Sequence, residues 1–302
     1  MIDRKLVVFR MAAATGSFTE AAAALGMSQP NVTQQLARLE ESLGVKLFAK
    51  TGRNVVLTPA GRELAAGCER LFSDSESLIR SVQCAAEGMK SRWIGGTLTA
   101  GGYLLPDLIA AYMKKRPGVS LSLSVANMRG IADALAARRL DVALVEGPFE
   151  RNCFLSHLYL EEELVPAFAP GTQKAEISLA EHIRSGKTLV LREGGSGTRW
   201  HFDRALEEFS LPPPNPRTVL EVDSFDALKL FVRNGIGITV ISPFAIRDEL
   251  RAGVLETGRF VEGPIRRELN FIHTADADLK FVDDFVSFCL AERRKPERRR
   301  GR

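Results

Sequence analysis

Residues 17–50 read SFTEAAAALGMSQPNVTQQLARLEESLGVKLFAK, and they predict two short helices joined by a tight break. Ser17 and Glu20 have the S-x-x-E spacing of a capping box, which starts a helix. Gly26 can adopt the positive φ that ends this helix. Ser28 can then cap a second helix that carries Pro30 in its first turn. Two helices around a short turn with glycine indicate a helix-turn-helix.

The second of these helices has an apolar face and a polar face. Its apolar positions recur at helical spacing and should face a core; they are Val32, Leu36, Leu39 and Leu43. Its polar face carries Gln29, Asn31, Thr33, Gln34 and Arg38. Amides can bind adenine edges and arginine can bind guanine. We therefore expect this face to contact DNA bases, with Ser28 and Pro30 beside it at the start of the helix. The alternative is an ordinary solvated helix face.

The stretch VKLFAKTGRNVVLTPAG, residues 45–61, predicts a short hairpin with its turn at TGRN. Lys50 and Arg53 lie near the tip of this wing and could contact phosphates beside a DNA groove. A solvated loop is the alternative for these two residues. Thr58 and Pro59 are typical of a helix start. Residues 1–58 are thus predicted to form a winged helix-turn-helix DNA-binding domain.

A single long helix is predicted for the segment 59–91. Its apolar and small residues alternate by four and three, as in a coiled-coil seam; they are Leu64, Cys68, Leu71, Ser75, Leu78, Val82, Ala85 and Met89. A helix of about 30 residues extends roughly 45 Å, so a small N-terminal domain cannot bury this seam. We expect it to pair with a second chain as a dimerisation helix. Packing on its own C-terminal domain is the alternative.

From Gly95 onward, predicted strands and helices alternate, which favours an α/β fold with mainly parallel sheets. Expected helices include 103–116 and 198–209, and expected strands include LDVALVEG and EELVPAFAP. We predict a domain over 92–293 with two Rossmann-like lobes. Lobe one would comprise 92–161 and 266–293, and lobe two 162–265. Ligands in such folds bind at the carboxyl ends of strands, near helix N-termini.

One strand-to-helix connection stands out in this domain, LREGGSGTRW at residues 191–200. Free backbone N–H groups at a helix N-terminus can hold an anion. The segment is not GxGxxG, it lacks the lysine of a Walker loop, and it is not a nucleophile elbow. An ordinary turn is the alternative.

The net charge and the cysteine content limit which class of protein this chain can belong to. The net charge of the 302 residues is +4, but residues 293–302, RRKPERRRGR, contribute +6, so the rest sums to −2. We expect residues 294–302 to be a disordered basic tail, with added DNA affinity as the alternative. No run approaches the roughly 20 apolar residues of a membrane span. The four cysteines are far apart and are expected to be small buried residues, with no metal site. A cytoplasmic location is expected.

An enzyme or a small-molecule binding protein with an N-terminal interaction module is the alternative function. An enzyme needs a catalytic constellation, whereas the four histidines are scattered along the chain. His201 is close to Ser196 in sequence, but on a helix it should point away as a satisfied surface histidine. We therefore expect no catalytic residues.

Taken together, the N-terminal motifs resemble the LysR-type transcriptional regulators. The resemblance lies in GSF-x-x-AA, the SQP turn, LE-x-x-LG, LF and LTPAG within residues 9–61, and it extends over the whole chain. It implies a winged helix-turn-helix, a linker helix for dimerisation, and an effector domain similar to periplasmic solute-binding proteins. It also implies a homodimer or homotetramer that binds an interrupted inverted repeat near a promoter, with RNA polymerase as a possible partner. Lys50 departs from the arginine usual in the family.

The C-terminal two-thirds look most like the subgroup of regulators of sulfur assimilation and carbon fixation. The matching segments are GGYLLP, LDVALVEGP, REGGSGTR and NGIGITVIS. The resemblance implies no cofactor but a small effector, expected to be an anion, between the lobes. The implied effector-binding residues are Thr97, Thr99, Glu146, Ser196, Gly197, Thr198, Arg199 and Ser224. Leu98 and Gly102 depart from the pattern of the subgroup, so the resemblance does not identify the ligand.

Overall fold

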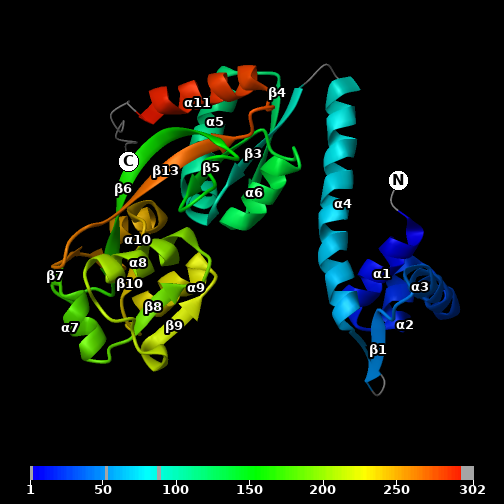
Figure 1. Cartoon of the computed structure of the whole chain (residues 1–302), viewed down its shortest axis with the longest axis horizontal. Helices are drawn as coiled ribbons and strands as arrows, with labels where there is room; N and C mark the ends of the chain where they lie inside the picture. Colours follow the sequence, from blue (N-terminus) through cyan, green and yellow to red (C-terminus); the bar gives the residue numbers. More distant parts are fainter. Residues whose placement is uncertain (1–2, 52–53, 87–89, 294–302) are drawn as a thin grey trace. The chain divides into compact units, whose positions relative to one another are not determined.

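The computed structural model describes residues 3–51, 54–86 and 90–293, and the chain divides into a unit up to residue 89 and a unit from residue 90 (Figure 1). Each unit has its own hydrophobic core. Lys50 has a described backbone but no described side chain, and Arg53 and the basic tail lie outside the described residues.

The first unit consists of four helices and a two-stranded wing: α1 (Arg4–Thr15), α2 (Phe18–Leu25), α3 (Gln29–Leu43), β1 (Phe48–Thr51), β2 (Asn54–Leu57) and α4 (Pro59–Ala86). The Ser17 hydroxyl caps α2 by accepting a hydrogen bond of 3.3 Å from the Glu20 amide, but the Ser17 amide donates to the Thr15 hydroxyl at 3.4 Å instead of to Glu20, so only half of the predicted capping box forms. Gly26 ends α2 with a φ of 62°. Ser28 occupies the N-cap position of α3, but its side chain accepts no capping hydrogen bond, so that part of the prediction is wrong.

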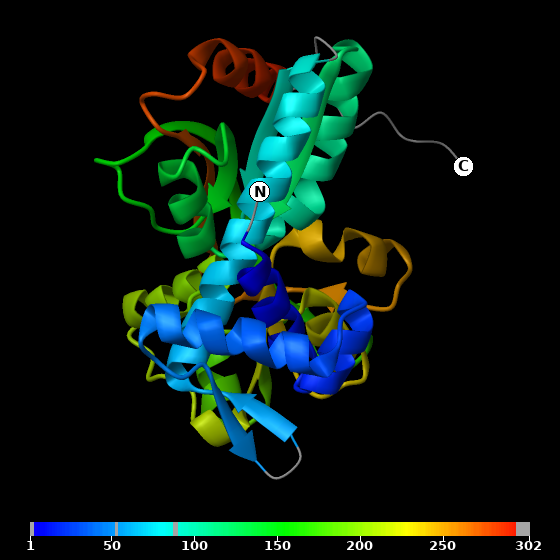
Figure 2. The ribbon, with the colours of Figure 1, turned by 90° about the vertical axis from the view of Figure 1, so that its right-hand side faces the viewer.

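The apolar face of α3 packs as its spacing predicts. Val32, Leu36 and Leu39 are buried against α1 and α2, where Phe9 and Ala21 are fully buried. Leu43, at the end of the helix, is instead 48% exposed. The polar face of α3 is therefore left on the surface of the unit. Figure 2 shows α3 running across the unit, with the β1–β2 hairpin extending from its lower edge.

Glu40 fixes the wing to α3. Its carboxylate accepts hydrogen bonds from Lys46 Nζ at 2.6 Å and from the Leu47 amide at 2.9 Å. Burial raises the pKa of this carboxyl, but these hydrogen bonds outweigh burial and hold the pKa below its usual value. The carboxylate thus stays charged while it positions the start of the hairpin.

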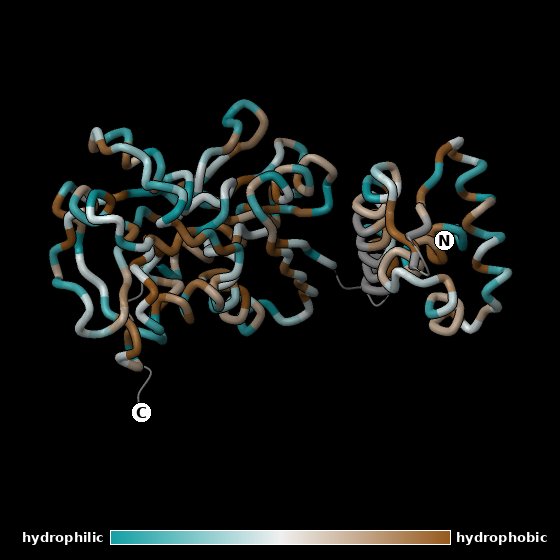
Figure 3. Tube along the Cα trace, turned by 90° about the horizontal axis from the view of Figure 1, so that it is seen from below, coloured by the Kyte–Doolittle hydropathy of each residue, from teal (hydrophilic) through white to brown (hydrophobic). Residues whose placement is uncertain are grey.

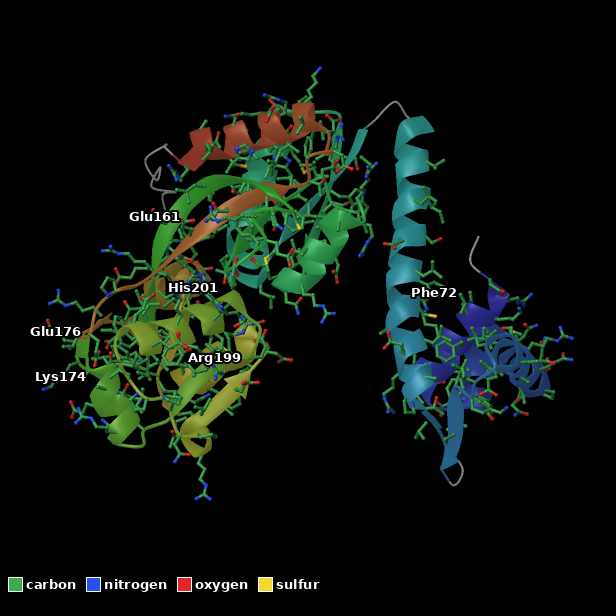
Figure 4. All side chains as sticks on the ribbon, viewed as in Figure 1. Phe72, Glu161, Lys174, Glu176, Arg199 and His201 are labelled. Atoms are coloured by element: carbon green, nitrogen blue, oxygen red, sulfur yellow. The ribbon has the colours of Figure 1, made fainter. Side chains whose placement is uncertain are left out.

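The long helix α4 has both buried and exposed apolar side chains. Cys68 and Phe72 are buried in the first unit, and the Arg10 guanidinium lies 3.9 Å from the centre of the Phe72 ring (Figure 4). By contrast, Leu71, Leu78 and Val82 are 45%, 56% and 61% exposed. The expected seam is therefore not uniform, because its first turns are already packed within the chain. The side chain of Ala85 and residue Met89 lie outside the described residues.

The second unit combines a mixed sheet with helices on its faces. The first-lobe elements are β3 (Lys90–Gly96), η1 (Ala100–Leu104), α5 (Leu105–Lys115), β4 (Val119–Val125), α6 (Met128–Ala136), β5 (Val142–Glu146) and α11 (Leu279–Arg293). The elements of lobe two are β7 (Glu176–Ile177), α7 (Leu179–Arg184), β8 (Leu189–Arg192), α8 (Gly197–Glu208), η2 (Pro216–Thr218), β9 (Val219–Val222), α9 (Phe225–Arg233), β10 (Thr239–Ile241), η3 (Pro243–Ile246), α10 (Arg247–Arg251), β11 (Glu256–Thr257) and β12 (Arg259–Phe260). The long strands β6 (Leu155–Phe168) and β13 (Ile265–His273) connect the two groups.

The largest sheet has the strand order β10-β6-β13-β5-β3-β4. Strand β3 pairs in parallel with β4 and β5, but β6, β13 and β10 pair antiparallel to their neighbours. The prediction of mainly parallel sheets is therefore wrong for the middle of the unit. Alternation of apolar residues indicates a strand but not the direction of its partner. Figure 1 shows β6 and β13 side by side over their length.

Two element boundaries also differ from the sequence prediction. The helix expected from residue 103 begins earlier, with the π-helical turn η1 ahead of α5. The strand expected at EELVPAFAP is the second half of the 14-residue β6. Its first half alternates between exposed and buried less regularly, so the sequence pattern does not show it.

Buried apolar residues form separate cores in the two lobes. One core includes Ile94, Tyr112 and Phe285, and the other includes Phe168 and Phe202. In Figure 3 the hydrophobic segments run through the interior of the unit and the hydrophilic ones around it. Cys68 and Cys289 are buried as expected, but Cys153 is exposed, so the prediction is wrong there; the side chain of Cys84 is not described. Among the described residues, no helix is long and apolar enough to span a membrane.

Candidate functional site

The polar face of α3 forms an exposed surface with hydrogen-bonding groups. The residues expected to contact DNA are all exposed here: Ser28, Gln29, Pro30, Asn31, Thr33, Gln34 and Arg38. Gln29 Nε2 donates to the Thr33 hydroxyl at 3.2 Å, and that hydroxyl donates to the Gln29 carbonyl at 3.1 Å. These bonds hold the Gln29 amide against α3. The wing residues Lys50 and Arg53, the other expected contacts, fall outside the described side chains.

A small cleft lies in the second unit where lobe one meets lobe two. Its volume is about 10 Å³, room for about one water molecule. Lobe one contributes Thr97, Leu98, Asn127, Met128 and Glu146 to its lining. Lobe two contributes Arg192, Gly195, Ser196, Gly197 and Thr198. Five of the expected effector-binding residues thus meet in this cleft: Thr97, Glu146, Ser196, Gly197 and Thr198.

The carboxylate of Glu146, at the end of β5, is the centre of this cleft. Glu146 is only 3% exposed. Its carboxylate accepts a hydrogen bond from the Thr97 hydroxyl and another, of 3.1 Å, from the Thr99 amide. The Thr99 hydroxyl beside it is buried and has no partner among the described residues. The fold therefore places a negative charge of its own where the sequence predicts an anion site.

The N-terminus of α8 borders the same cleft. The Ser196 hydroxyl accepts from the Arg199 amide at 3.1 Å, so this side chain acts as the N-cap. A Cβ atom on Gly197 would lie 2.6 Å from the Glu146 carbonyl oxygen, which explains why this position is glycine. The amides of Gly197 and Thr198 belong to the first helical turn, whose N–H groups have no partner within the helix. Helix α8 thus offers two amides and its positive end to the cleft.

Two expected effector-binding residues have other roles. Arg199 makes ion pairs with Asp203 at 2.9 Å and Glu221 at 3.3 Å, and it does not line the cleft. Ser224 is exposed, and its hydroxyl accepts from the Ala227 amide as the N-cap of α9. Both side chains are used by other contacts, which their position in a loop or first helical turn does not show.

Five residues that line the cleft are absent from the predicted effector-binding set: Leu98, Asn127, Met128, Arg192 and Gly195. Asn127 is the N-cap of α6 and accepts from the Gly130 amide at 2.9 Å. A cap residue after a strand could have indicated this position. Arg192 is buried, donates to Glu193 at 2.8 and 2.9 Å, and lies 4.2 Å from the centre of the Phe225 ring. A strand residue with such partners carries no signal in the sequence.

The histidines are less isolated than the sequence suggests. His157 and His273 lie on β6 and β13, and their Nε2 atoms are 3.2 Å apart. His201 was expected to be a satisfied surface residue, and this expectation is wrong. Its Nε2 atom is buried and has no partner in the described part of the chain. Burial, together with the nearby positive charges of Arg267 and Arg204, lowers the pKa of His201 to about 4.

Comparison with known proteins agrees with this architecture. Residues 4–62 match the bacterial regulatory helix-turn-helix protein family of LysR type, and residues 93–294 match the LysR substrate binding domain. The HTH-type transcriptional regulator YeiE of Escherichia coli strain K12 is 33% identical over 297 residues, which cover 95% of this chain and 96% of YeiE. The HTH-type transcriptional activator CmpR of Synechocystis is 31% identical, over 94% of this chain and 93% of CmpR.

Solved structures show the same fold. The LysR family regulator CbnR has a TM-score of 0.75 and 20% sequence identity, with 98% of this chain and 100% of CbnR covered. CbnR in complex with its target DNA gives a TM-score of 0.73 over 96% of this chain and 99% of that chain, again at 20% identity. From these matches and its two domains, the chain belongs to the LysR family of DNA-binding transcriptional regulators with an effector-binding domain, and it is a regulator rather than an enzyme.

Proposed function

We propose that the chain binds an interrupted inverted repeat near a promoter as a dimer, with α3 reading bases in the major groove. The exposed amides and guanidinium on α3 support this assignment. Residues 1–58 would bind DNA, and 59–91 would connect and pair two chains. The exposed apolar residues Leu71, Leu78 and Val82 of α4 support the pairing. Two recognition helices would then address half-sites about one helical turn, or a multiple of it, apart.

Further partners belong to the same proposal. Contacts between effector domains, 92–293, would extend the dimer to a tetramer, and a promoter-bound regulator would contact RNA polymerase. Lys50 and Arg53 would contact phosphates, which makes binding dependent on salt. A DNA-binding regulator acts where the bacterial DNA is, so its location would be the cytoplasm. Sedimentation of the full chain with and without operator DNA would separate dimer from tetramer.

The effector is proposed to be a small anion that binds in the cleft by replacing the carboxylate of Glu146. The unpartnered Thr99 hydroxyl and the amides of Gly197 and Thr198 support this site. With a volume of about 10 Å³ the cleft has no room for an anion while Glu146 occupies it. Effector binding would therefore require Glu146 to move and the lobes to separate. It shifts the DNA-binding state only to the extent that the two lobe arrangements differ in affinity for the anion.

The DNA assignment is tested by the double variant Gln29→Ala/Arg38→Ala in gel-shift and salt-titration assays. Each bidentate base contact is worth about 1–3 kcal/mol, so we expect preference for operator over random DNA to fall by at least about 30-fold. Effector binding should not change. The exposed helix residue Arg233 of the second unit provides the matched control, Arg233→Ala. Unchanged operator preference in the double variant would reject the assignment of α3 as the reading helix.

The anion assignment is tested by thermal shift of the full chain with sulfate, sulfite, phosphate and dicarboxylates. Binding at a hundredfold excess over Kd stabilises a protein by about 2.7 kcal/mol. Thr97→Val should weaken the response. Glu146→Gln, which keeps the shape but removes the competing charge, should strengthen the response to anions. If Glu146→Gln responds to neutral ligands and to none of the anions, the effector class is wrong although the cleft is correct.

A further inference from the structure

A second and much larger cavity lies in the effector unit, apart from the cleft at Glu146. Its volume is 660 Å³, within the range of about 300–1,000 Å³ that is usual for sites of organic ligands. The loop after β5, the middle of α8 and strand β13 line it, and no residue lines both cavities. Helix α8 separates them, because residues 196–198 border the cleft and residues 200–208 border the cavity.

The cavity has an apolar surface suited to a planar group. Phe149, Trp200, Ala205 and Ile265 are among its lining residues. Trp200 is 38% exposed, so its ring is accessible to a ligand in the cavity. The guanidinium groups of Arg204 and Arg151 lie 5.4 and 5.6 Å from the ring centres of Trp200 and Phe149. A flat apolar ligand could stack on the rings of Phe149 and Trp200, each of which also has a guanidinium group nearby.

Buried polar atoms of the lining can still donate to a ligand. His201 Nε2 is buried and makes no hydrogen bond to any described residue (Figure 4 labels His201 on α8). Arg267 is fully buried; its Nε donates to Glu162 at 2.7 Å and its Nη1 donates to the Thr198 hydroxyl at 3.1 Å. Its Nη2 is ion-paired with the same Glu162 oxygen at 2.6 Å, and because this group carries two protons, one of them is left for a ligand. In the tautomer of His201 that carries its proton on Nε2, this buried N–H has no acceptor, which is costly, so an acceptor is expected at this floor.

The charges around the floor favour an acceptor with a single negative charge. Positive charges of Arg267 and Arg204 act on His201 and help to keep its ring neutral, since they oppose a proton there. At the rim, the carboxylates of Glu208 and Glu268 already accept from Arg204 at 3.0 Å and Asn270 at 3.2 Å. Glu161, also at the rim, adds a negative charge without a partner among the described residues. The lining thus has four arginines against three glutamates, a formal net charge of +1, which favours an anion with a single charge.

We infer that this cavity is a second ligand site and that it binds an organic monocarboxylate with a planar apolar body. The carboxylate accepts from His201 Nε2 and Arg267 Nη2 at the floor, and the body lies against Phe149 and Trp200. The site is independent of the effector cleft proposed above.

Trp200 provides a direct readout, because the chain has only two tryptophans, Trp93 and Trp200. In full-length Trp93→Phe, Trp200 is the only tryptophan, and its fluorescence reports occupancy of the cavity. We expect phenylacetate and 4-phenylbutyrate to change this fluorescence to saturation, and neutral phenylacetamide to bind at least about tenfold more weakly. Absence of saturation by either carboxylate up to about 10 mM, or equal binding of the amide, overturns the inference.

Variants locate the site. His201→Leu removes the donor and should weaken phenylacetate at least about tenfold, whereas His201→Gln keeps an N–H at a similar position and should retain most of the affinity. Thr97→Val in the other cleft should leave phenylacetate binding unchanged. Circular dichroism in urea shows whether each variant is folded. If Thr97→Val weakens phenylacetate and His201→Leu does not, the probe occupies the cleft at Glu146 and the second site is rejected. Because no DNA is present, this outcome is separate from the DNA-binding test.

Discussion

The two units of the chain hold their candidate functional residues in opposite ways. On α3, the side chains proposed to contact DNA are exposed, although Gln29 and Thr33 also hydrogen-bond to each other. In the effector unit, Thr97, Glu146 and Thr198 are buried and hydrogen-bonded inside the fold. The surface of α3 is thus open to a large partner, whereas the cleft at Glu146 would have to exchange internal partners for a ligand. Mutations on α3 should therefore change DNA binding without changing stability. Mutations in the cleft should change ligand binding and stability together.

The largest effect on stability is expected at the buried ion pair of Glu162 and Arg267. Both side chains are buried, at 5% and 0% exposure, and Ser242 also donates to Glu162 at 2.7 Å. Arg267→Met leaves a buried charge without its partner, which costs about 3–5 kcal/mol. Urea unfolding of the second unit would measure this loss. Arg204→Met removes an exposed pair of 3.0 Å with Glu208 and should change stability by less than about 1 kcal/mol. Similar losses in both variants would contradict the contrast between buried and exposed charges.

The next effect is a pH dependence from His201. Its pKa is about 4 in the fold and has an ordinary value of 6.5 when exposed. Between these values the unfolded chain binds more protons, so stability falls as the pH is lowered from 6.5 to 4, by up to about 3 kcal/mol. His201→Gln cannot titrate and should have a flatter profile over this window. Parallel unfolding profiles of the two proteins from pH 7 to 4 would show that His201 is not the titrating group.

A smaller effect is expected where α8 meets Glu146. Gly197→Ala places a Cβ atom 2.6 Å from the Glu146 carbonyl, and the resulting strain costs about 1–3 kcal/mol. It should also weaken anion binding in the cleft. Gly194→Ala is a close control, because no atom lies within 4 Å of its added Cβ. Calorimetry should find that variant as stable as the original chain or up to about 1 kcal/mol more stable. Equal destabilisation by both variants would mean that contact with Glu146 does not select glycine at position 197.

The smallest effect on stability is expected on α3. Asn31→Ala and Gln34→Ala remove exposed side chains and should change the free energy of unfolding by no more than about 0.5 kcal/mol. Their loss in operator affinity should nevertheless be measurable by gel shift. A loss of stability larger than the loss in binding would show that these amides have a structural role, and the contrast between the two units would not hold.

The contrast between the two units also explains which parts of the fold and of the candidate site the sequence predicts. The helices of the first unit follow from local signals, such as the N-cap at Ser17 and the apolar spacing of Val32, Leu36 and Leu39. In the second unit, the sequence locates Thr97, Glu146 and Ser196 mainly through resemblance to the family. It does not show that Glu146 accepts from Thr97 or that Arg199 pairs with Glu221, because such partners are far apart in the chain. The free Nε2 of His201 depends on neighbours from β13 for the same reason.

Strands β6 and β13 have a mechanical consequence for regulation. They are paired along the whole of β13, from Ile265 with Leu164 to His273 with Leu155, and they connect the two lobes. Any rotation of one lobe against the other must therefore twist a continuous two-stranded ribbon rather than turn about a loose linker. The pairing shifts in register between Leu269 and Asn270, an irregularity of the kind that bends and twists a strand locally. If effector binding rotates the lobes, as proposed above, this ribbon resists the rotation and favours return of the lobes to their original angle.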